Sequence, residues 1–144
     1  MTTLTPDESA YDLDPVLIEL AEALTAVRQG DAAPYTALWS TADDVTLFGA
    51  WGPIEHGHDQ VARTIPWVVS RFGPEGRTIQ DLRTIHQSGD LAVTVGFERG
   101  PAQVDGGPVD EMVIRVTHVL RKEPCGWRLV HRHADFPPAD PRAA

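Results

Sequence analysis

The second half of the sequence most constrains the fold, because hydrophobicity alternates there with the two-residue period of β-strands. This pattern covers residues 77–87, 91–99, 109–121 and 127–135. Turn-forming stretches separate the four segments: Gly89-Asp90, residues 100–108 and Pro124-Cys125-Gly126. Short connections between successive strands favour antiparallel pairing. The pattern therefore predicts an antiparallel sheet whose two faces can be assigned from the alternation.

The first half is typical of helices. Apolar residues recur at helical spacing after Asp14-Pro15 and up to Gly30, which suit the two ends of a helix. Asp31 can cap a second, short helix that ends near Trp39 with Tyr35, Leu38 and Trp39 facing inward. Residues 45–48 form a short strand, and a third helix runs from Asp59 to Phe72 with a bend expected at Pro66.

Helices followed by antiparallel strands indicate an α+β fold. We expect one domain over residues 14–135, built as a curved antiparallel sheet with three helices over its concave face. Residues 1–13 and 136–144 are expected to be tails. A pocket between the helices and the sheet is where such a fold binds small molecules.

Composition excludes several partner classes. The net charge is −9, and no basic stripe is present that could neutralise nucleic-acid phosphates or anionic lipid headgroups. The N-terminal residues lack a signal-peptide pattern and no apolar run is long enough to cross a bilayer, so a cytoplasmic location is expected. The single cysteine, Cys125, lies in a predicted turn and cannot form an intrachain disulfide.

The turn at residues 122–126 predicts a register for the last two strands. If Arg121 lies opposite Arg128, then His118 lies opposite His131, and His133 lies opposite Val116. The three histidines then share the inner face with Leu120, Leu129 and Trp127. The outer face is predicted to carry Arg115, Thr117, Arg132 and Glu98.

This grouping makes His118, His131, His133 and Asp135 the candidate catalytic residues. His131 or His133 would act as a general base, Asp135 would orient it, and His118 would be a second polar contact. The alternative is a set of core histidines that bond to backbone carbonyls or water. A metal bound by the three histidines is geometrically conceivable but is not expected, and no cofactor is predicted.

Other residues are candidates for ligand contact. Six aromatic residues could line an apolar pocket, although most would be ordinary core: Trp39, Phe48, Trp51, Trp67, Phe72 and Phe97. The loop with Glu55, His56 and His58 could cover the pocket mouth, but a polar surface loop is the simpler interpretation. Asp43-Asp44 is interpreted as a solvated turn.

Three motifs carry a family resemblance: WSTADDVTLFG (39–49), GDLAVTVGFERG (89–100) and RVTHVLRKEPCGWRLVHRHAD (115–135). They resemble the SnoaL-like, ketosteroid-isomerase-like branch of the nuclear transport factor 2-like superfamily. The last motif is also similar to the association domain of calcium/calmodulin-dependent kinases. The resemblance implies a cone-shaped half-barrel with a deep pocket, and a homodimer formed through the outer sheet face. Arg115, Arg132 and Glu98 would suit a salt-bridged interface there.

The resemblance leaves the activity open, because one fold hosts many functions. The base of the ketosteroid isomerases would fall at Gly49, and their second aspartate near Thr117 or His118, so both carboxylates are missing. We therefore expect a pocket protein for a small apolar or carbonyl-bearing molecule, with cofactor-free acid–base chemistry of the isomerase, cyclase, dehydratase or hydrolase type. The alternative is a non-catalytic dimer that binds a small ligand or serves as an association module.

Overall fold

A computed structural model describes residues 12–143 of the chain. The helices are α2 (Asp14–Val27), α3 (Ala33–Ala37) and α4 (His58–Val69), followed near the C-terminus by the short 3-10 helix η1 (Pro141–Ala143). The strands are β1 (Thr46–Phe48), β2 (Ile54–His56), β3 (Ile79–Ser88), β4 (Leu91–Arg99), β5 (Pro101–Gln103), β6 (Val109–Glu111), β7 (Ile114–Glu123) and β8 (Gly126–Asp135).

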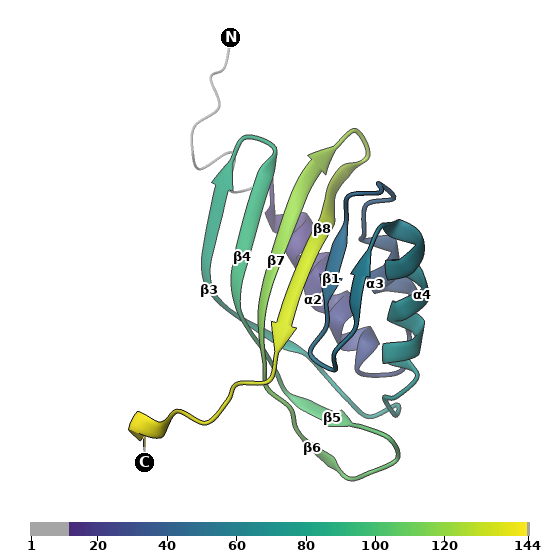
Figure 1. Cartoon of the computed structure of the whole chain (residues 1–144), viewed down its shortest axis with the longest axis vertical. Coiled ribbons are helices and arrows are strands. Elements are labelled where there is room, and N and C mark those ends of the chain that lie inside the picture. The colour runs from purple at the N-terminus through teal and green to yellow at the C-terminus, as the bar shows by residue number, and fades with distance from the viewer. Residues whose placement is uncertain (1–11, 144) are drawn as a thin grey trace.

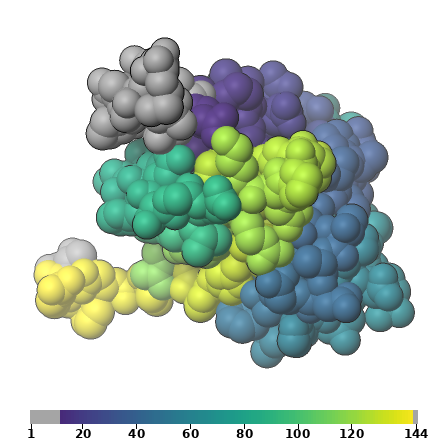
Figure 2. All heavy atoms as spheres, turned by 90° about the horizontal axis from the view of Figure 1, so that it is seen from above, coloured from purple at the N-terminus to yellow at the C-terminus, as the bar shows by residue number. Residues whose placement is uncertain are grey.

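Six strands form one curved sheet in the order β2-β1-β8-β7-β4-β3 (Figure 1). The pairs are antiparallel except β1–β8, which is parallel. The helices lie on one side of the sheet, and β5 and β6 form a separate hairpin at its lower end. In the view from above, the purple atoms that include α2 lie along one side of the green atoms of the sheet (Figure 2). The predicted α+β architecture with three helices over a curved sheet is confirmed.

The core forms between the apolar stripe of α2 and the inner side of the sheet. Leu20 and Leu24 of α2 are buried in one cluster with Ala92, Leu120 and Leu129 from β4, β7 and β8. Full burial of a leucine side chain contributes about 1.5–3 kcal/mol. Because β4 presents small residues to this side, α2 can lie close to the strands.

The elements differ from the prediction in three places. Residues 54–56, expected in a loop, form β2; residues 101–103, expected in a turn, form β5; and the predicted strand 109–121 is divided into β6 and β7. Gly100 explains the last two differences, because its φ of +126° lets the chain leave β4 and start the hairpin.

A bulge in β8 changes the predicted faces. The pairs Arg121–Arg128 and Leu120–Leu129 are as predicted, but the register then shifts, so that Val119 pairs with His131 and His118 with Arg132. The backbone N–H of Leu129 donates to the carbonyl oxygen of Leu38, and its carbonyl oxygen accepts from the N–H of Ser40. From His131 onward, β8 pairs with β1 instead. The extra residue, Val130, reverses the side on which every later residue of β8 lies.

The residues just before α2, predicted to belong to a tail, contact the rest of the domain. Of the predicted tail 1–13, residues 1–11 lie outside the described part of the chain, whereas Leu13 is buried in the main core. Asp12 accepts hydrogen bonds from Lys122 and from the indole of Trp127. Within residues 12–143, no helix is long and apolar enough to span a membrane.

Candidate functional site

A cavity of about 80 Å³ lies between the helices, the inner side of the sheet and the loop 49–53. Its wall is largely apolar, with Leu24, Val27, Leu47, Ile65, Val68, Val69, Phe72, Met112 and Ile114 among the lining residues. The polar lining residues are Arg28, Tyr35, Thr78, Glu98 and Arg132. An apolar cavity with a few convergent polar groups is the usual form of a small-molecule site.

An ion pair between Glu98 and Arg132 forms the polar end of this cavity. Nη1 of Arg132 donates to Oε2 of Glu98 at 2.6 Å and Nη2 donates to Oε1 at 2.9 Å. The two side chains are only 4% and 12% exposed. Burial raises the pKa of Glu98, but the charge and hydrogen bonds of Arg132 outweigh burial, so the pKa lies below its usual value. Glu98 is therefore ionised at neutral pH.

His118 extends the network below the cavity wall. Its Nε2 lies 3.2 Å from Nη1 of Arg132 and 2.9 Å from the hydroxyl of Tyr35. An arginine N–H can only donate, so Nε2 accepts, the ring proton lies on Nδ1, and Tyr35 donates as well. Nδ1 is buried without a hydrogen-bond partner among the described residues. Burial and the charge of Arg132 lower the pKa of His118 to about 3, so the ring is neutral.

Tyr35 is a hydrogen-bond donor in the same place. It lies on α3 and packs edge-on against both Trp39 and His118. Burial raises the pKa of Tyr35 to about 12, so its hydroxyl keeps its proton. At neutral pH this network therefore combines the carboxylate of Glu98, the guanidinium of Arg132, a neutral imidazole and a phenol.

Arg28 is a second buried guanidinium on the cavity wall. Its Nη1 donates to the carbonyl oxygens of Gly100 and Met112 at 2.8 and 3.1 Å, and its Nη2 donates to that of Glu98 at 3.2 Å. These bonds tie α2 to the end of β4 and to the strand hairpin that follows. Burial lowers the pKa of Arg28, but an arginine does not lose its proton at neutral pH in a protein, so Arg28 remains charged.

Aromatic residues border the cavity beside the loop 49–53. The Trp51 ring lies 5.3 Å from the Phe72 ring and 6.4 Å from that of Phe136, measured between centroids. The guanidinium of Arg71 stacks on Trp51 at 3.9 Å and forms an ion pair with Asp105. Trp51 is thus held by stacking contacts from two other segments of the chain.

The structure brings only one of the four predicted catalytic residues to this site. His118 points inward, but the bulge turns His131, His133 and Asp135 to the outer side of the sheet. There His131 and His133 contact Phe48 edge-on, and Asp135 forms an exposed ion pair with Arg115. The predicted inner position of His131 and His133 is therefore wrong, and so is the predicted outer position of Arg132.

His131 has its own partners on the outer side. Its Nδ1 lies 2.7 Å from Oγ1 of Thr46. Burial and the neighbouring His133 lower the pKa of His131. Neither ring is near the carboxylate of Glu98, because that carboxylate lies on the opposite side of the sheet.

The six predicted aromatic residues are also divided. Trp51 and Phe72 line the cavity. Trp39 is buried in the core next to Tyr35, with its indole nitrogen unpaired among the described residues. Phe48 and Trp67 are exposed, and Phe97 lies outward beneath the guanidinium groups of Arg83 and Arg99.

The sequence prediction did not name Arg28, Tyr35 or Thr78 as residues of the site, and it placed Glu98 and Arg132 on the wrong side of the sheet. Two signals were available. Arg28 follows Leu20 and Leu24 at intervals of four, which places it on the buried side of α2. The successive apolar residues Leu129 and Val130 break the alternation of β8, as a bulge does.

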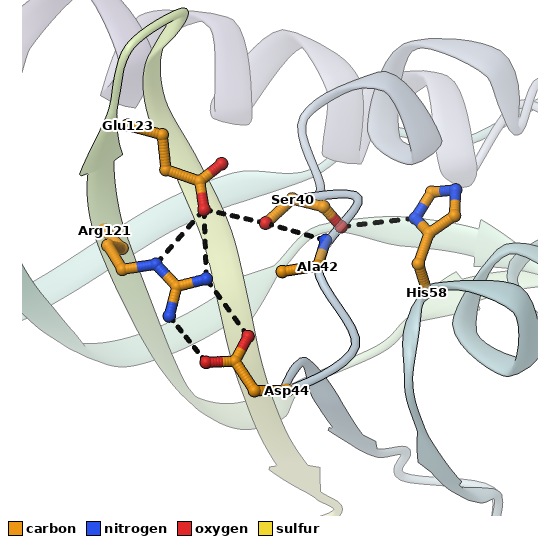
Figure 3. Close-up of polar contacts among 6 residues, drawn as sticks. All are labelled: Ser40, Ala42, Asp44, His58, Arg121 and Glu123. Atoms are coloured by element: carbon orange, nitrogen blue, oxygen red, sulfur yellow. Dashed lines mark hydrogen bonds and ion pairs between the residues drawn. The ribbon is translucent and has the colours of Figure 1, made fainter.

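A second polar cluster lies away from the cavity and is structural (Figure 3). Arg121 pairs with Asp44 and Glu123, and Oγ of Ser40 donates to Glu123 at 2.8 Å. His58 donates from Nδ1 to the carbonyl oxygen of Ser40. Because the hydroxyl of Ser40 points to a carboxylate that is already paired, it is not an activated nucleophile. The cluster joins the chain before β1 to β7 and α4.

The loop predicted to cover the mouth does not border the cavity. Glu55 and His56 belong to β2 and His58 begins α4, whereas Gly49, Ala50, Trp51 and Pro53 line the cavity. His56 and His58 border a separate, open hollow with Asp43, Asp59 and Arg63. Within residues 12–143, no three His, Cys, Asp or Glu side chains are placed to hold a metal ion together.

Comparisons with known proteins agree with this architecture. A model of the SnoaL-like domain family matches residues 18–139. A ketosteroid isomerase-like protein from Erwinia carotovora has a TM-score of 0.74 at 20% identity, over 92% of this chain and 99% of that one. No curated protein gave a significant match.

Two further structures with the same fold have different assigned roles. A protein from Streptomyces avermitilis, provisionally assigned as a dehydratase, has a TM-score of 0.76 at 23% identity, over 94% of this chain and 100% of that one. A provisionally assigned calcium/calmodulin-dependent protein kinase II association domain from Xanthomonas campestris has a TM-score of 0.72 at 16% identity, over 96% and 95%. At these identities the comparisons show the fold alone.

Proposed function

Because the chain belongs to the SnoaL-like domain family, we propose that it binds a small, largely apolar molecule in the cavity and performs cofactor-free acid–base chemistry on it. The observation that carries this proposal is the buried Glu98–Arg132 pair, which lies on the wall of an otherwise apolar cavity. Buried charges are costly to maintain, and they concentrate at functional sites.

The groups have distinct roles in the proposal. Glu98, ionised and shielded from bulk water, accepts a proton from the ligand. Arg132 donates hydrogen bonds to a carbonyl or developing oxyanion, as a preorganised donor does in a site of low dielectric. His118 positions Arg132 by accepting from its Nη1, and Tyr35 holds His118 in place by donating its hydroxyl proton to the same Nε2. His131, His133 and Asp135 take no part in this chemistry.

The size of the cavity limits the ligand. Its volume of about 80 Å³ is well below the roughly 300–1,000 Å³ of pockets for drug-sized ligands. A steroid or a polycyclic polyketide therefore does not fit this conformation. The proposed ligand has only a few carbon atoms, unless the loop 49–53 moves aside.

Substitutions on the two sides of the sheet test the proposal. With a substrate found by screening small carbonyl compounds, Glu98→Gln and Arg132→Gln should each lower kcat/KM by about 10²-fold or more. His131→Ala and His133→Ala, on the outer side, should leave kcat/KM within about 3-fold. Full activity in both inner variants would refute the chemistry assigned to this site, and a large loss in the outer variants would return the function to the histidines.

We also propose, as the alternative function, a homodimeric association module formed through the outer side of the sheet. Val93, Val95, Thr117 and Val119 face outward at its centre and remain partly accessible, and Phe48, Ile54 and Leu91 are exposed around them. Arg99, Arg115 and Arg121 each have an acidic partner on this side. A largely apolar surface on a chain of charge −9 is where two copies repel least.

Light scattering after size exclusion tests the dimer. Val95→Asp should convert it to a monomer, because two unpaired carboxylates would be buried in the interface. Ile18→Asp, at an exposed apolar position on α2, is the matched control and should remain a dimer. A wild-type monomer, or a Val95→Asp dimer, would contradict this interface. Loss of turnover in the inner-side variants would favour the enzyme over the module.

A further inference from the structure

We propose that the ligand of the cavity is a small monocarboxylate, bound through its carboxylate to Arg28 and Arg132. This inference deepens the proposed function and rests on it. The charged residues that line the cavity are Arg28, Arg132 and Glu98. Among the described lining residues, two positive charges and one negative charge sum to +1, in a protein whose net charge is −9.

Arg28 has no carboxylate as a direct partner among the described residues. Its hydrogen bonds go to backbone carbonyl oxygens, which carry no net charge, and the charges of Glu98 and Glu111 act on it only at longer range. The carboxylate of Glu98 is already engaged by both terminal nitrogens of Arg132. A buried guanidinium without its own carboxylate is costly, and a bound anion would offset that cost. A neutral ligand would not offset the cost of the buried charge.

Both guanidinium groups also have hydrogen-bonding capacity left. Arg132 uses Nη1 and Nη2 toward Glu98 and the second Nη1 proton toward His118, so that Nε–H and one Nη2–H bond to no described residue. Arg28 likewise makes no described bond through Nε. The Nε–Nη2 edge of a guanidinium fits a carboxylate bidentately, as Arg115 shows with Asp135 in this protein.

The rest of the wall describes the body of the ligand. Leu24, Leu47, Ile65 and Val69 offer only apolar surface. The small volume selects a short, branched or compact hydrocarbon. A branched four-carbon acid is the simplest molecule that meets both requirements, and its amide has nearly the same shape without the charge.

The test compares isobutyrate with isobutyramide on the wild-type protein, by ligand-observed NMR and calorimetry at pH 7.5. We expect isobutyrate to bind at least about 10-fold more tightly, because only the anion compensates the buried charge. Glu98→Gln should strengthen isobutyrate binding by about 3-fold or more, since it removes the competing carboxylate. Arg132→Gln should weaken it by about 10-fold or more. Arg115→Gln, on the outer side, is the matched control and should change neither ligand.

The outcomes separate the two levels of the proposal. Equal binding of acid and amide would overturn the carboxylate inference and leave the apolar-pocket function standing. If Arg115→Gln weakened isobutyrate binding as much as Arg132→Gln does, the anion would bind at the outer surface, and the inference would be overturned. Failure of both probes to bind would overturn the inference together with the proposed function. The comparison on the wild-type protein decides the first and third of these outcomes even if an arginine variant does not fold.

Discussion

Replacing Glu98 by leucine should strongly destabilise the protein. The change leaves Arg132, only 12% exposed, as a buried charge without a counter-ion, and it adds to the charge of Arg28 nearby. Breaking one side of a buried pair costs about 3–5 kcal/mol. Asp135→Leu is the control, because the Arg115–Asp135 pair is about half exposed at 48% and 47%, and such pairs contribute about 0–1 kcal/mol.

Urea unfolding followed by circular dichroism and tryptophan fluorescence, at one fixed protein concentration, would measure both losses. The double variant Glu98→Leu/Arg132→Met removes both charges and should recover most of the stability, to within about 1–2 kcal/mol of wild type. A Glu98→Leu loss below about 1 kcal/mol, equal to that of Asp135→Leu, would show that the pair is solvated and would refute the buried network.

Three further predictions concern other parts of the account. His118 has a pKa of about 3 in the folded protein and about 6.5 in the unfolded chain, so below about pH 6.5 the unfolded state binds an extra proton and the free energy of unfolding falls as the pH falls. Between pH 6.5 and 5, His118 should account for about 2 kcal/mol of this loss. Urea unfolding at several pH values measures it, and a His118→Asn variant whose stability falls as steeply with pH as that of the wild type would contradict the prediction. Trp51→Ala removes the stacking contacts with Phe72 and Arg71, which should lower the free energy of unfolding by about 1–2 kcal/mol. The ligand should also dissociate faster in stopped-flow measurements. An unchanged dissociation rate would mean that Trp51 does not close the cavity. Deletion of Val130 removes the bulge, which would turn Arg132 outward and leave Glu98 buried and unpaired. The variant should therefore lack cooperative thermal unfolding. A cooperative transition like that of the wild type would mean that the bulge does not set the register.

The sequence was sufficient for the fold because its strongest signals are periodic. The helical spacing of Leu20 and Leu24 and the alternation of β4 both reflect burial against a common core, and the structure has the corresponding elements. Short elements such as β2 carry too few residues for a period to be read. Their pairing depends on neighbours that are distant in the sequence.

The site was less accessible to prediction because one residue reversed it. The turn before β8 set the first two pairs correctly, and the bulge at Val130 then moved His131 and His133 outward and Arg132 inward. Glu98 was misplaced with it, since a charged residue in a strand is normally assigned to solvent. The burial of Glu98 becomes understandable only when Arg132, 34 residues away in the sequence, is placed beside it.

Chemical-shift mapping of bound isobutyrate by NMR tests the central claim most directly, because the two sides of the sheet carry different signals. We expect the largest changes at the Arg28 and Arg132 side chains and at the Trp51 indole, with His131 and His133 unchanged. Largest changes at His131 and His133, with the arginine signals unmoved, would contradict the inward-facing site.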